Sequence, residues 1–94
     1  MKYVPKPIDT SDIKLSDDVL ALTEQIAKNV HEVWAKGKIN EGWVYGKEKD
    51  SIKKTTPCLV EYESLPEEEK QVDRNTALET LRLIEKLGFK IEKR

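Results

Sequence analysis

The clearest hydrophobic pattern in the chain lies within residues 17–36. Ser16 precedes this stretch as a suitable N-cap, and we expect Gly37 to end the helix, because glycine readily adopts the left-handed conformation that follows a helix. The apolar spacing predicts one amphipathic helix that turns a single stripe toward a core. The residues of this stripe recur at steps of three and four along the chain: Val19, Leu22, Ile26, Val30 and Val33.

Two further helices are predicted in the last third of the chain. Ser64 is followed three positions later by Glu67, a capping-box pattern that indicates a short helix over residues 65–71. Asp73 suits the N-cap of a new helix, which we expect over residues 74–87, with Gly88 as its end. The apolar stripe of this last helix is formed by Ala77, Leu78, Leu81, Ile84 and Leu87.

Both ends of the chain are predicted to be extended. Residues 1–15 contain Pro5 and Pro7 in alternation, and proline favours extended geometry for itself and for its predecessor. We therefore expect an extended arm that packs on the core. Residues 89–92 alternate apolar and polar side chains, which predicts a short strand paired with the arm. The same strand edge could pair with a second copy of the chain, so self-association stays open.

A long connection, residues 37–57, separates the first helix from the rest. Most connections in compact domains are about four to six residues long, so this length favours a functional or mobile segment. Its first half is aromatic and flanked by glycines, with Trp43 and Tyr45, and its second half is polar and charged. Residues 58–62 follow as a short extended segment that we expect to pack against the first helix.

Together these elements predict an α+β fold in one domain, residues 1–94. It would contain two main antiparallel-packed helices, a short helix, short terminal strands and the long inter-helix loop. The 17 basic and 18 acidic residues nearly cancel, which argues against a nucleic-acid-binding surface. The single cysteine, Cys58, excludes an intramolecular disulfide, and one Cys with one His cannot form a Cys/His zinc site. We expect no metal and no cofactor.

Membrane and export signals are not apparent in the sequence. No stretch approaches the ~18 apolar residues of a membrane span, and residues 1–12 lack the apolar core of a signal peptide. We therefore expect a cytoplasmic protein, or a domain of one, without membrane insertion. The sequence does not distinguish a whole protein from an excised domain.

Five short motifs follow one another along the chain. They are Tyr3-x-Pro5-x-Pro7-Ile8-Asp9, Ala27-x-Asn29-x-His31-x-x-Trp34, Gly42-Trp43-x-Tyr45-Gly46, Pro57-x-Leu59-Val60-x-Tyr62-x-x-Leu65 and Glu69-Lys70-x-x-Asp73-Arg74. In this order they resemble the ryanodine-receptor repeat domain, or RyR domain, over about positions 3–92. The resemblance implies an α+β unit with two principal helices and no enzymatic activity. With one copy, the chain is similar to the solitary microbial members of unknown role, and not to the tandem pairs of the calcium-release channels.

Trp43, Tyr45, His31 and Trp34 are the candidate binding residues. The two loop aromatics could anchor a partner or stack on a ligand, since aromatic residues dominate binding hot spots, or they could fold the loop back onto the domain. His31 and Trp34 lie three positions apart, on neighbouring positions of one helical face. Because no Ser or Cys is placed beside His31, a histidine bonded to loop backbone is favoured over a catalytic base. Cys58 is expected to be a buried structural thiol.

In the channels that the chain resembles, the inter-helix loop is an exposed site of kinase regulation. This makes Ser51, Thr55 and Thr56 candidates for phosphorylation, although no arginine-directed site is present and a solvated polar loop is the favoured reading. We expect a non-enzymatic protein-interaction or regulatory module with an unidentified protein partner. A small-metabolite sensor that uses the aromatic loop is the alternative, and an enzyme using Cys58 and His31 is a third hypothesis.

Overall fold

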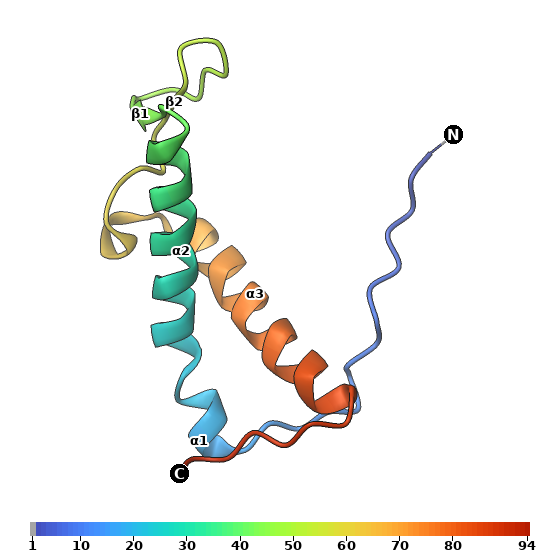
Figure 1. The fold of residues 1–94 in the computed structure, drawn as a ribbon. Coiled ribbons are helices and arrows are strands. Elements are labelled where there is room, and N and C mark those ends of the chain that lie inside the picture. The colour runs from blue at the N-terminus through green and yellow to red at the C-terminus, as the bar shows by residue number, and fades with distance from the viewer. Residues whose placement is uncertain (1) are drawn as a thin grey trace.

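The computed structural model describes residues 2–94. In chain order its elements are α1 (Asp17–Leu20), α2 (Thr23–Asn40), β1 (Val44–Tyr45), β2 (Thr55–Thr56), the 3-10 helix η1 (Tyr62–Ser64) and α3 (Glu67–Lys86). Two long helices with a small two-stranded sheet confirm the predicted α+β class. Figure 1 shows that α2 and α3 run in opposite directions and splay apart, with β1 and β2 beyond the C-terminal end of α2.

The helix predicted over residues 17–36 is divided in the structure. Ser16 caps α1 as expected, since its Oγ accepts a hydrogen bond of 3.3 Å from the backbone N–H of Val19. A turn at Ala21 and Leu22 then separates α1 from α2, and α2 continues through Gly37 to Asn40. A glycine inside a helix costs only about 0.5–1 kcal/mol relative to alanine, which the surrounding turns can outweigh. The left-handed residue after this helix is Gly42, with φ 93°.

The helices predicted over residues 65–71 and 74–87 are one continuous helix, α3. Its N-cap is Pro66, and Asp73 lies inside the helix instead of starting a new one. Aspartate is only a moderately poor helix former, at well under about 1 kcal/mol relative to alanine, so packing decides the outcome. Gly88 follows the helix with φ 98°, as expected for the residue that ends it.

The core consists of two clusters. The first contains Leu15, Val19 and Leu81, with Ile13, Ile26, Leu78 and Ile91 packed against it. The second contains Ala27, Tyr62 and Leu65, with Cys58 and Val60 packed against it. The segment after β2 therefore packs on α2 as predicted, and the second cluster lies under the loop that carries the sheet.

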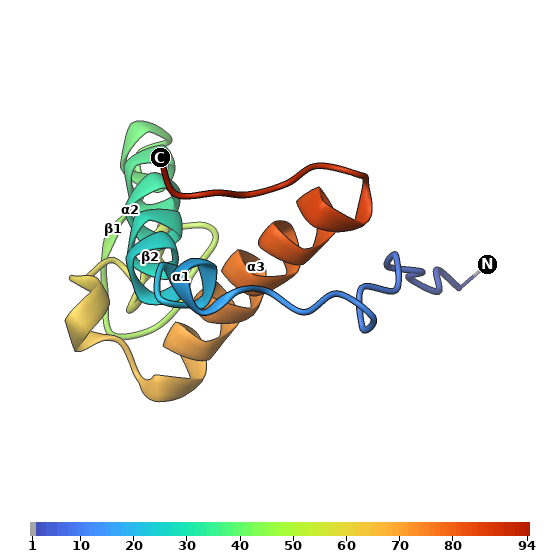
Figure 2. The same ribbon diagram turned by 90° about the horizontal axis from the view of Figure 1, so that it is seen from below.

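The terminal strands are not formed within residues 2–94. Residues 2–9 are extended but unpaired, and the arm leaves the body of the molecule, with Tyr3 85% exposed (Figures 1 and 2). Pro5 and Pro7 lack the backbone N–H that a sheet ladder needs, which gives a physical reason for the missing pairing. Residues 89–92 are also not a strand; instead the tail returns to the core, where Ile91 packs on the first cluster.

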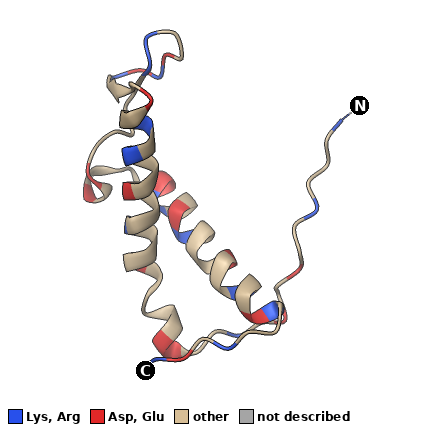
Figure 3. Cartoon of the chain, in the orientation of Figure 1, with Lys and Arg blue, Asp and Glu red and all other residues tan. Residues whose placement is uncertain are grey.

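The connection between α2 and η1, residues 41–61, begins four positions later than the predicted loop 37–57 and contains the two strands. β1 and β2 pair in parallel, with Val44 opposite Thr55 and Tyr45 opposite Thr56. Figure 3 shows acidic and basic residues interspersed along the helices and this loop. Within residues 2–94, no helix has both the length and the apolar character needed to cross a bilayer.

Candidate functional site

A cleft of about 410 Å³ lies between α2, α3 and the loop that carries the sheet. Three of the four predicted binding residues line it, namely His31, Trp34 and Trp43. Tyr45 does not; it lies on β1, beside Trp43 in the chain, and is 56% exposed. The structure therefore brings together residues of the first helix and of the aromatic loop. We call this cavity the aromatic cleft.

Trp43 is held against the end of α2. Its backbone N–H donates a hydrogen bond of 3.0 Å to the carbonyl of Lys38, after the left-handed turn at Gly42. The Lys38 ammonium in turn lies 4.8 Å from the centroid of the Trp43 ring, a cation–π contact. Lys54 fixes the same turn by donating to the carbonyl of Glu41 at 2.9 Å. Trp43 is thus half-buried against the domain and still lines the cleft.

The parallel ladder fixes the loop in place. A Cβ on Gly46 would lie 2.7 Å from the Cβ of Thr55, so the two strands can approach this closely only because Gly46 has no side chain. Asp50 organises the intervening turn, since its Oδ1 accepts the backbone N–H groups of Ile52 and Lys53 at 2.9 and 3.1 Å. The loop wall of the cleft therefore has a defined backbone.

His31 forms the floor of the cleft and is only 3% exposed. Its Nε2 lies 2.7 Å from the carbonyl oxygen of Val60. Because a carbonyl oxygen can only accept, Nε2 carries the proton and donates, as expected for a histidine bonded to loop backbone. The ring stacks on Trp34 with centroids 5.6 Å apart and lies 6.3 Å from the ring of Tyr62.

The cleft also contains charged residues that sequence analysis missed. Lys38 and Lys49 belong to the α2 and loop walls, and Glu69 and Asp73 belong to the α3 wall. Burial raises the pKa of the Asp73 carboxyl, while the nearby ring of His31 acts to lower it. The spacing of four between Glu69 and Asp73 places both on one face of a helix, which was the available sequence signal.

A network of ion pairs and hydrogen bonds links α3 to α2 and η1. Arg74 donates from Nε to Glu24 on α2 and from Nη1 to Glu67 on α3, the latter at 3.0 Å. The hydroxyl of Tyr62 donates to the second oxygen of Glu24 at 3.2 Å. Hydrogen bonds from Arg74 lower the pKa of both Glu24 and Glu67. This network joins α2, η1 and α3, the helices that surround or adjoin the cleft.

The three candidate phosphorylation residues lie in different environments. Ser51 is exposed in the turn between the strands. The hydroxyl of Thr55 donates to the carbonyl of Glu48 at 2.9 Å, and Thr56 is buried and accepts the backbone N–H of Cys58 at 3.2 Å. A kinase would therefore reach Thr55 and Thr56 only if the ladder opened. Cys58 itself is half-buried and packs against the second core cluster.

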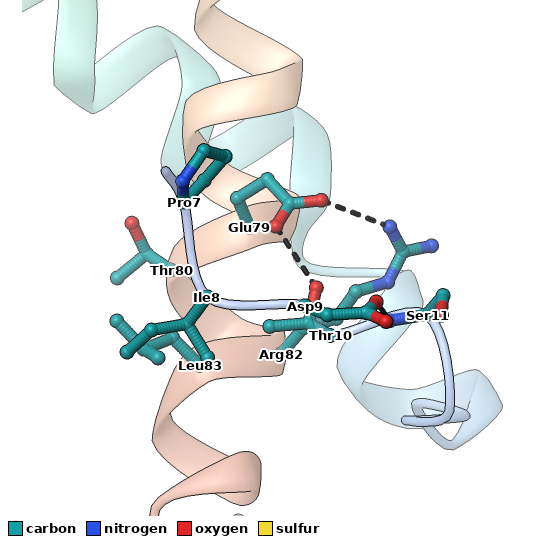
Figure 4. A pocket seen from close by; sticks show the side chains of 9 residues that line it. All are labelled: Pro7, Ile8, Asp9, Thr10, Ser11, Glu79, Thr80, Arg82 and Leu83. Carbon is teal, nitrogen blue, oxygen red and sulfur yellow. Dashed lines mark hydrogen bonds and ion pairs between the residues drawn. The ribbon is translucent and has the colours of Figure 1, made fainter. Parts of the chain in front are cut away.

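A second hollow, of about 790 Å³, lies between the N-terminal arm and α3. Figure 4 shows that Glu79 links its two sides. The Thr10 hydroxyl donates to one oxygen of Glu79 at 2.9 Å, and Arg82 Nη1 donates to the other at 3.4 Å. Arg82 Nε is buried without a hydrogen-bond partner among residues 2–94, and none of the predicted site residues lines the hollow. The aromatic cleft is therefore the candidate site.

Comparison with known families agrees with the motifs. The sequence model of the family described as RyR domain matches residues 3–93, which is essentially the whole described chain.

Proposed function

This chain belongs to the RyR domain family, and from that premise we propose that it is a non-enzymatic regulatory module that holds a segment of a protein partner in the aromatic cleft. Membership of the family suggests a regulatory or interaction role. The single observation that carries the proposal is the convergence of His31, Trp34 and Trp43 on one cavity of about 410 Å³. Aromatic side chains around a concave surface are the usual anchors of a protein contact.

The accessibility of the aromatic residues supports a contact surface. Trp34 is 37% exposed although it lines the cavity, so part of its ring is available to an incoming group. Val44 and Tyr45 follow Trp43 directly on β1 and are both more than half exposed. A partner segment that entered the cleft could continue along this strand.

The position of His31 and Cys58 favours binding over catalysis. His31 uses Nε2 to hold the Val60 carbonyl, so this nitrogen is not available as a base. Cys58 packs against Tyr62 and Leu65 in the second core cluster. Both side chains therefore have structural contacts, which supports a binding role for the cleft.

A small-metabolite sensor is the second candidate, and the size of the cleft favours it. Small-molecule pockets commonly measure about 300–1,000 Å³, and the aromatic cleft falls within that range. A planar ligand could stack on Trp34 or Trp43. Its binding would change the tryptophan fluorescence of the protein, whereas a partner that needs an extended contact would be missed in a metabolite screen.

The proposal can be tested by capturing partners through crosslinking and then measuring the affinity of this protein for each purified partner. A photo-crosslinking residue at position 45 would capture partners in extract of the source cells, and each captured protein would then be purified and its affinity measured. We expect Trp43→Ala to weaken that affinity by at least about tenfold, as for a hot-spot residue. Ile52→Ala is the matched control, because Ile52 is 95% exposed on the same loop but outside the cleft. Equal losses for the two variants would contradict the proposal.

A further inference from the structure

The α3 wall of the aromatic cleft is acidic. Glu69 and Asp73 both line the cavity, one helical turn apart. Among residues 2–94 the Asp73 carboxylate has no ion-pair partner and no hydrogen bond, and the influences on it are burial and the ring of His31. A half-buried carboxylate without a donor has lost part of its hydration and has no hydrogen bond in return. Such a group favours a ligand that brings a cation or an N–H donor.

The lysines opposite do not compensate this charge. Lys38 is already engaged, since its ammonium lies 4.8 Å from the centre of the Trp43 ring and 4.0 Å from the Glu41 carboxylate. Lys49 lies on the loop wall, so the α3 wall keeps two acidic side chains against this one basic residue. Two basic and two acidic side chains line the cleft as a whole, so its attraction for a cation is local to the Asp73 carboxylate.

The aromatic residues of the cleft suit a cation as well. An indole ring attracts a positive charge placed over its face, and the contact between Lys38 and Trp43 is an intramolecular instance of this. Trp34 lines the same cavity as Asp73 and stacks on His31, whose own position is fixed by Val60. A cation that entered would meet a rigid aromatic surface beside a carboxylate.

We propose that the aromatic cleft selects a partner segment that carries an arginine, whose guanidinium stacks on Trp34 and pairs with the carboxylate of Asp73. Arginine fits better than lysine, because its planar, weakly hydrated guanidinium can stack on an aromatic ring and donate two parallel hydrogen bonds to a carboxylate. This inference rests on the proposed function, since it names the chemistry of the partner held in the same cleft.

Two short peptides that differ only in charge test the inference. The probes are acetyl-Gly-Arg-Gly-amide and the same peptide with citrulline, which has nearly the shape of arginine but no charge. Binding would be followed through the indole N–H and backbone amide signals of the 15N-labelled protein. We expect the arginine peptide to bind roughly tenfold more tightly, as for a hydrogen bond to a charged group, with shifts at the Trp34 indole.

Variants of α3 test whether the charge of Asp73 causes the preference for arginine over citrulline. Asp73→Asn keeps the shape of the side chain and should reduce the preference for arginine over citrulline to less than about twofold. Glu68→Gln is the matched control, because Glu68 is exposed on the same helix and does not line the cleft. It should leave the preference unchanged. An unchanged dispersion of the amide spectrum would show that both variants are folded.

Two results would overturn the inference. One is equal affinity for the arginine and citrulline peptides, and the other is the absence of any shift at the Trp34 indole with either peptide at millimolar concentration. Neither result bears on the proposed function, which fails separately if no purified partner depends on Trp43. If a partner depended on Trp43 but bound equally well to Asp73→Asn, the proposed binding function would stand and the arginine inference would be wrong.

Discussion

The ring of His31 and the backbone of Val60 are joined by a hydrogen bond of 2.7 Å, which connects the buried side of α2 to the segment beneath the aromatic cleft. The bond spans 29 positions of the chain. It fixes the tautomer of the histidine and gives the carbonyl of the half-buried Val60 a donor. The candidate site is therefore built on a structural histidine.

Replacing His31 should destabilise the protein. His31→Ala would leave the Val60 carbonyl without its donor and open a cavity beside Trp34 and Tyr62. We expect the free energy of unfolding, measured by urea denaturation, to fall by about 2–4 kcal/mol. His31→Gln, which keeps an N–H donor, should lose less. If the two variants were equally stable, the hydrogen bond would not be the cause.

Acidification should weaken the ion-pair network between α2 and α3. Hydrogen bonds from Arg74 hold the pKa of Glu24 below its usual value of 4.5 in the folded protein. A group whose pKa is lowered by folding adds stability above its unfolded pKa, and that stability is lost as the pH falls through the folded pKa. The melting temperature should therefore drop below about pH 4.5 more steeply in the wild type than in Glu24→Gln. Parallel curves for the two proteins would exclude this linkage.

Replacing Gly46 should open the loop locally, because Gly46 lies close to Thr55. In Gly46→Ala the new Cβ would collide with Thr55, whose Cβ is anchored to the backbone and cannot swing aside. We expect a loss of about 1–3 kcal/mol in stability and faster tryptic cleavage after Lys47 and Lys49. Cleavage at wild-type rates would mean that β1 and β2 accommodate the methyl group without separating.

Replacing Gly37 should stabilise the protein, in contrast to replacing Gly46. It lies inside α2, and a Cβ built there would have no neighbour within 4 Å. Gly37→Ala should therefore raise the free energy of unfolding by about 0.5–1 kcal/mol, because alanine restricts the unfolded chain and favours the helix. Thermal and urea denaturation would measure the gain. A destabilised Gly37→Ala protein would place the end of α2 before this residue.

The sequence was most informative where apolar spacing and packing agree. Val19 and Ile26 of the predicted stripe enter the first core cluster, and Gly88 ends α3 as its position suggested. The stripe was wrong at Leu22 and Val33, which are 41% and 64% exposed, because the buried face of α2 is formed by Ala27 and His31. Gly37 and Asp73 misled the prediction because each is only mildly unfavourable in a helix, by about 1 kcal/mol or less. Long-range packing outweighs preferences of that size.

The rest of the site could not be predicted because its parts are distant in sequence. β1 and β2 have two residues each, too short for an alternating pattern, and their pairing depends on the close approach of Gly46 to Thr55. The charged residues of the cleft come from positions 38, 49, 69 and 73, which only the folded chain brings together. The motifs identified the aromatic residues but not the acidic wall beside them.

The unpaired N-terminal arm has a consequence for aggregation. Along an extended segment, alternate N–H groups point to opposite edges. Pro5 and Pro7, two positions apart, therefore remove donors from the same edge of residues 2–9. The arm also exposes Tyr3, Val4 and Ile8. Without the prolines, such an apolar extended segment would be prone to aggregate. With two successive donors removed from this edge, the arm pairs poorly on that side, which disfavours stacking of copies through it into a continuous fibril.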